Sequence, residues 1–67
     1  MKEMNAEQRA KFLFDLFEFI EYDSKVKTFM ARKSCALILV QELMKDVDIK
    51  SRDFIYWSNV KLNLLEL

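Results

Sequence analysis

Apolar residues recur every three or four positions along three stretches of this chain, which is the periodicity of amphipathic helices. The first stretch predicts a helix from about Asn5 to Tyr22. Asn5 is a good N-cap, and Gln8 stands three residues later, as in a capping box. Phe14 lies at the edge of the apolar face of this helix, beside charged residues. The face itself is broad and contains Phe12, Leu13, Leu16, Phe17, Phe19 and Ile20.

A second helix is predicted from about Ser24 to Asp46, with Asp23 or Ser24 as its cap. Lys33 projects near the centre of the main apolar stripe of this helix. Either its methylene stem packs while the amine reaches water, or its charge pairs across an interface. The stripe contains Val26, Phe29, Met30, Ala36, Leu37, Val40, Leu43 and Met44.

The third stretch runs from about Ser51 to Leu67, with Ser51 as a fair N-cap. Residues 54–57 have β propensity, and residues 60–64 alternate with period two, so the pattern is mixed. A lone strand would need a partner, and the chain offers none. Helix is therefore the better prediction, and a strand paired across a dimer axis is the alternative. On a helix, two apolar arcs result: one of Phe54, Ile55, Leu62 and Leu65, the other of Tyr56, Trp57, Val60 and Leu64.

The elements predict an all-α fold, a small three-helix bundle in which residues 1–67 form a single helical domain. The connection around Asp23 is short, so the first two helices are expected to form an antiparallel hairpin. Leu13 and Leu37 lie in the middle of their apolar faces and are predicted core residues. A domain of 67 residues is marginally stable alone, and dimerisation is expected to complete it.

Composition excludes several kinds of chemistry. The chain has no His, no Gly, no Pro and one Cys. It therefore has no intrachain disulfide, no Cys/His zinc site, no His-based nucleophile system and no Gly-rich phosphate loop. Carboxylates such as Glu18 and Glu21 are neighbours on a helix, but a bundle of this size has little room for a pocket around them. We predict a protein that is not an enzyme, with no catalytic, cofactor-binding or metal-binding residues.

Charge is balanced overall, with 11 basic and 11 acidic residues. The first helix ends acidic and the second begins basic, which opposes both helix dipoles, and in a hairpin the two ends can offset each other. The basic residues Lys25, Lys27, Arg32 and Lys33 give the alternative function, a small nucleic-acid-binding regulator. A phosphate-binding domain usually has a marked positive excess, which is missing here, so we do not expect nucleic acid as the partner.

Location in the cytoplasm is expected, because the lone thiol fits a reducing compartment and the N-terminal residues show no secretory signal. The longest apolar run covers residues 35–40, far short of the roughly 20 residues that span a bilayer. We expect no membrane partner.

Contact with a larger protein is the predicted function, because more apolar residues are present than a three-helix monomer can bury. Small adaptors, anti-activators and regulators encoded by phages or other mobile elements have a similar profile. A homodimer is expected as well. The candidate partner-binding residues are Phe14, Tyr56, Trp57, Val60 and Leu64.

Overall fold

The computed structural model describes residues 4–67 and contains three helices: α1 (Ala6–Leu16), α2 (Lys25–Met44) and α3 (Arg52–Leu65). The all-helical prediction is confirmed, and within residues 4–67 no strand is present, so the third stretch is a helix. Residues 1–3, which entered the expectation about the N-terminal signal, lie outside the described residues.

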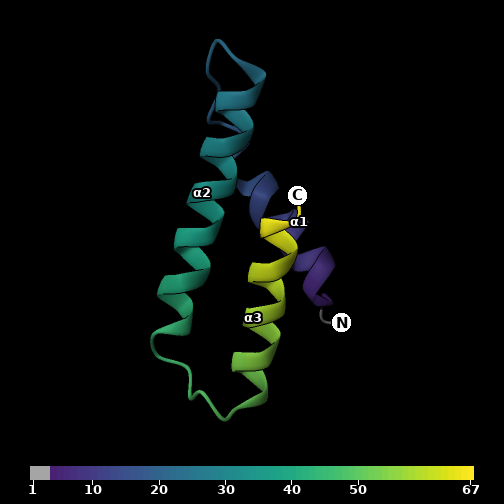
Figure 1. The fold of residues 1–67 in the computed structure, drawn as a ribbon, viewed down its shortest axis with the longest axis vertical. Coiled ribbons are helices and arrows are strands. Elements are labelled where there is room, and N and C mark those ends of the chain that lie inside the picture. The colour runs from purple at the N-terminus through teal and green to yellow at the C-terminus, as the bar shows by residue number, and fades with distance from the viewer. Residues whose placement is uncertain (1–3) are drawn as a thin grey trace.

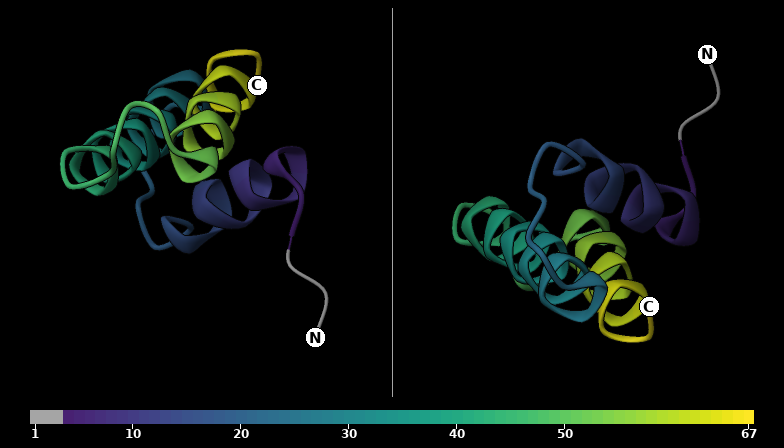
Figure 2. Two further views of the ribbon diagram at one scale, coloured as in Figure 1. Left: turned by 90° about the horizontal axis from the view of Figure 1, so that it is seen from below. Right: turned by 90° about the horizontal axis from the view of Figure 1, so that it is seen from above.

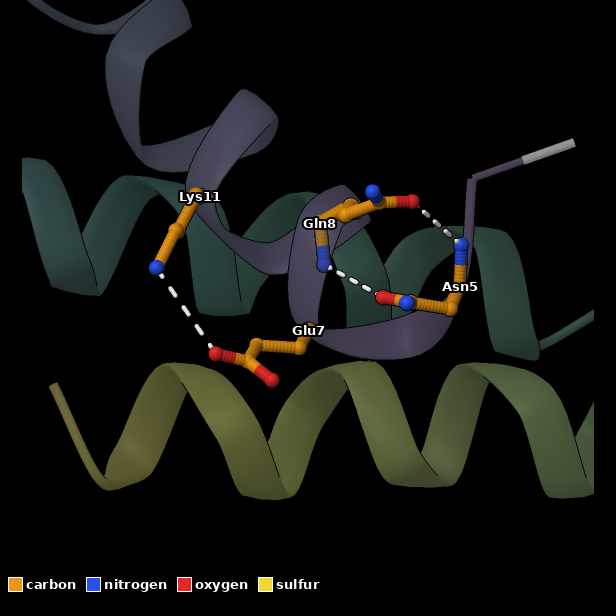
Figure 3. A network of polar contacts seen from close by, with 4 residues as sticks. All are labelled: Asn5, Glu7, Gln8 and Lys11. Carbon is orange, nitrogen blue, oxygen red and sulfur yellow. Dashed lines mark hydrogen bonds and ion pairs between the residues drawn. The ribbon is translucent and has the colours of Figure 1, made fainter.

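Each helix begins at the residue that the sequence predicts, because a polar side chain satisfies a free backbone N–H there. Asn5 Oδ1 accepts the Gln8 N–H at 2.8 Å, and Gln8 Oε1 accepts the Asn5 N–H at 3.1 Å, which completes the predicted capping box (Figure 3). Ser24 Oγ accepts from the amide of Lys27, and Ser51 Oγ accepts from the amide of Phe54.

Removing the Asn5 cap is expected to destabilise the fold. Asn5→Ala leaves the first turn of α1 without its acceptor and should lower the free energy of unfolding by about 0.5–2 kcal/mol. Asn5→Ser keeps an oxygen in the capping position and should change it little. Urea unfolding followed by circular dichroism measures both, and equal stabilities for the two variants would contradict this role of Asn5.

Helices α2 and α3 run antiparallel along the long axis of the molecule, and α1 crosses one face of this pair (Figures 1 and 2). The prediction that the first two helices form the hairpin is therefore wrong: α2 and α3 form it, and α1 packs more extensively on α3 than on α2. The cause is the early end of α1. The helix stops at Leu16 instead of continuing to Tyr22, and residues 17–24 give a connection long enough for α1 to cross.

The core lies where the three helices meet. Its buried members are Ala10, Leu13, Ala36, Val40, Val60 and Leu64. Leu13 is a core residue as predicted, whereas Leu37 is half-buried and packs at the edge of the core. Two of the six buried residues are alanines, one on α1 and one on α2, and small side chains at a contact allow helices to approach closely.

Several residues of the apolar stripe predicted for the second helix remain on the surface. Val26, Met30 and Leu43 are exposed. The amino-terminal end of α2, which carries Val26 and Met30, extends beyond α1 and α3 (Figure 1). The structure therefore buries only part of the apolar surface that periodicity assigns to the core.

Lys33 links two helices. Its Nζ donates to the Leu65 carbonyl at 2.7 Å and lies 5.8 Å from the centre of the Phe29 ring. A cation near the carboxyl end of a helix is favourable, because it faces the negative end of the helix dipole. Lys33 thus connects α2 to the carboxyl end of α3 through a hydrogen bond within the same chain.

Candidate protein-interaction site

The five predicted partner-binding residues lie in different environments. Val60 and Leu64 are fully buried in the chain's own core, so this part of the prediction is corrected: neither side chain is available to a partner. Of the two arcs on α3, the arc of Tyr56, Trp57, Val60 and Leu64 faces inward, because α1 packs against it.

Tyr56 and Trp57 are half-buried against this core, with their rings 5.2 Å apart and edge to face. The Tyr56 hydroxyl donates to the Met4 carbonyl at 2.8 Å and accepts from Arg9 Nε at 3.3 Å. These contacts tie α3 to the beginning of α1. Both aromatic residues therefore have a structural role, although they also line an open groove with Arg9, Arg52 and Asp53.

Phe14 is half-buried on α1. It packs against the core, and its ring is tilted against that of Phe29 with the centres 5.3 Å apart. These two rings border an open groove between α1 and the beginning of α2. The groove is lined by Phe14, Glu21, Tyr22, Asp23, Lys25, Thr28, Phe29 and Arg32.

Next to this groove, residues 17–24 are held in place by side chains of α2. Arg32 donates from Nε to the Ile20 carbonyl at 3.0 Å and from Nη2 to the Glu18 carbonyl at 2.7 Å. Thr28 Oγ1 accepts the Tyr22 N–H at 2.8 Å. A segment without regular helix thus keeps a defined shape, because its backbone groups have partners.

This segment presents large apolar side chains to solvent. Phe19 is 76% exposed and Tyr22 is 56% exposed, and Val26 in the first turn of α2 is 68% exposed. We call the surface formed by Phe19, Tyr22 and Val26, together with the adjoining groove, the aromatic end. Periodicity placed Phe19 in the buried face of a longer helix and so missed it as a surface residue.

One sequence feature could have revealed this end. The predicted last turns of the first helix carry Asp15, Glu18 and Glu21, and negative charges disfavour the carboxyl end of a helix. The helix ends before two of these three acidic residues.

The basic start of α2 does not form a free cationic cluster. Arg32 and Lys33 both donate to backbone carbonyls of the chain. The two ion pairs found within residues 4–67 lie elsewhere, Lys11–Glu7 at 3.7 Å (Figure 3) and Lys45–Glu42 at 2.8 Å. The expected offset between the acidic and basic ends is therefore not made by direct ion pairs in this part of the chain.

Comparison with protein-family models, with curated proteins and with solved structures gives no match to this chain. In the described part of the chain, no helix combines the length and the apolar character needed to cross a membrane. Nor do residues 4–67 bring together three or more His, Cys, Asp or Glu side chains in an arrangement suited to a metal ion.

Proposed function

We propose that this chain is a small non-enzymatic protein-interaction module that binds and modulates a larger protein through its aromatic end. The observation that carries the proposal is the exposure of Phe19 and Tyr22 on a segment that Arg32 and Thr28 hold in place. Aromatic side chains dominate the binding energy of many interfaces. Holding them in position before binding reduces the entropy lost on association.

The residues that line the groove indicate which kind of partner surface fits it. Phe14 and Phe29 supply apolar lining, and the charged lining residues are Glu21 and Asp23 together with Lys25 and Arg32, two of each sign. A partner surface with an apolar side chain for the groove and charged side chains of both signs around it fits this arrangement, because complementary charge favours the correct encounter.

The alternative, a nucleic-acid-binding regulator, has less support. Two of its four candidate residues, Arg32 and Lys33, donate to backbone carbonyls, and the net charge of the chain is zero. Phosphate binding depends on cations that are free to replace counterions.

Substitution of Phe19 tests the proposed function. In affinity capture from the native host with quantitative mass spectrometry, Phe19→Ser should reduce recovery of one specific protein about 10-fold or more. Ile49→Ser is the matched control, since Ile49 is also highly exposed but lies in the α2–α3 connection. The captured protein, once purified, should bind the wild type and Ile49→Ser more tightly than Phe19→Ser. Equal recovery with both variants would contradict a role for the aromatic end.

A further inference from the structure

A second exposed apolar surface runs along α3, on the side of the helix away from the core. Its apolar residues are Ile55, Leu62 and Leu65, and the small, half-buried Ser58 completes a series spaced three, four and three positions apart. This is the spacing of a coiled-coil seam. Ile55 is 60% exposed, Leu62 55% and Leu65 50%. We call these four residues the α3 stripe.

The stripe remains uncovered because the core uses the opposite side of the same helix. Val60 and Leu64, which are fully buried, point away from Leu62 when 3.6 residues make one turn. Helix α1 covers only one face of the α2–α3 pair (Figure 2). No element within residues 4–67 therefore covers the stripe, which keeps its large side chains exposed.

We propose that a second copy of this chain packs on the α3 stripe, with the two α3 helices antiparallel about a two-fold axis. In this arrangement Ile55 faces the partner's Leu65, and Ser58 faces the partner's Leu62. A surface that forms a two-fold interface must be complementary to itself. The antiparallel pairing meets this condition, because each small Ser58 stands opposite a large leucine. A parallel pairing would place the two Ser58 side chains opposite each other and leave a gap.

Charges beside the stripe favour the same orientation. Arg52 and Glu66 lie at opposite ends of α3, on the same flank of the stripe, and both are exposed. An antiparallel pair brings Arg52 next to the partner's Glu66 and repeats this contact at the other end. Charges that flank a helix seam set the partner and the orientation of the helices.

Surface area agrees with a second copy as the occupant. The chain exposes 5397 Å². A folded monomer of its mass, 8.1 kDa, is expected to expose about 4,500 Å². The excess is several hundred Å², and a standard interface removes about 800 Å² from each partner. One interface on this face would bring each copy close to the exposure of a compact protein.

The α3 stripe and the aromatic end are different surfaces, so self-association does not depend on the proposed function. The connection between α1 and α2 lies at one end of the long axis (Figure 1). The two-fold axis across α3 would place the two aromatic ends at opposite ends of the dimer. The dimer would then offer two separate copies of the partner-binding surface.

Sedimentation equilibrium of the full chain over a wide concentration range tests the proposal. The wild type should approach twice its mass of 8.1 kDa, and Leu62→Lys should weaken dimerisation about 10-fold or more. Ile49→Lys, with a more exposed side chain that lies away from the stripe, should dimerise like the wild type, and circular dichroism should show that both variants stay folded. A wild type that remains monomeric, or equal losses in the two variants, would overturn the proposal and leave partner capture through Phe19 unaffected.

A charge exchange tests the orientation. Arg52→Glu and Glu66→Arg should each weaken dimerisation several-fold, and the double variant should restore it. Each substitution places its new charge favourably for the dipole of α3, so weaker association cannot result from a weaker helix. If the double variant dimerises no better than the single variants, the antiparallel arrangement is wrong.

Discussion

Leu64→Ala is expected to lower the free energy of unfolding by about 2–5 kcal/mol. Leu64 has no exposed surface and packs where the three helices meet. Truncation leaves a cavity that the neighbouring Val40 and Val60, which are already fully buried, cannot fill without moving backbone. A domain of 67 residues has a total stability of roughly 3–10 kcal/mol, so this single change removes a large part of it.

Ile49→Ala is the control for this prediction. Ile49 is 74% exposed in the connection between α2 and α3, so its truncation should change stability by less than about 0.5 kcal/mol. Urea unfolding at several protein concentrations measures both variants, because self-association makes stability depend on concentration. A Leu64→Ala variant with the wild-type midpoint would show that Leu64 does not belong to the core.

The beginnings of the helices could be predicted from the sequence because they depend on local contacts. Asn5 and Ser51 each accept a hydrogen bond from an amide three residues later, and this signal lies within one turn of chain. The pattern of residues 52–65 is mixed, and helix is predicted there because the chain offers no partner for a strand; the structure confirms the helix.

The end of the first helix could not be predicted from periodicity, because contacts distant in sequence decide it. Arg32 binds the carbonyls of Glu18 and Ile20, fourteen and twelve residues away, and these contacts hold the chain in a non-helical path. By periodicity alone, Phe17 and Phe19 continue the apolar face of the first helix, so the helix is predicted to extend past Leu16. The pairing of helices was mispredicted for the same reason, since the extra length of the connection is what lets α1 cross.

The sequence does not distinguish the buried Val60 and Leu64 from exposed residues of α3, because the two arcs are similarly apolar. Which arc faces inward depends on where α1 packs, and this is a tertiary choice that the helix itself does not encode. Aromatic residues pointed to the arc of Tyr56 and Trp57, but the Tyr56 hydroxyl is bound within the chain. The exposed arc, with Leu62 and Leu65, contains only aliphatic residues and one phenylalanine.

Arg32→Met should release residues 17–23 and lower the free energy of unfolding by about 1–3 kcal/mol. Two hydrogen bonds from a charged donor are lost, and the partial exposure of Arg32 reduces their value below that of a fully buried group. The Ile20 and Tyr22 amides, which donate to Phe17 and Thr28, should exchange with solvent faster. Because Phe19 and Tyr22 lose their fixed positions, capture of the partner should weaken as well.

Lys33→Met is the matched control. It also removes a cation, at the next residue, but the contact that is lost lies at the end of α3 and not in residues 17–24. Its amine binds the Leu65 carbonyl, so its loss should speed exchange of the Glu66 and Leu67 amides and leave those of Ile20 and Tyr22 unchanged. Hydrogen exchange followed by nuclear magnetic resonance resolves the two pairs of amides. If Arg32→Met and Lys33→Met speed the exchange of the same amides, both variants act by lowering the stability of the whole fold. Arg32 would then have no specific role in holding the aromatic end.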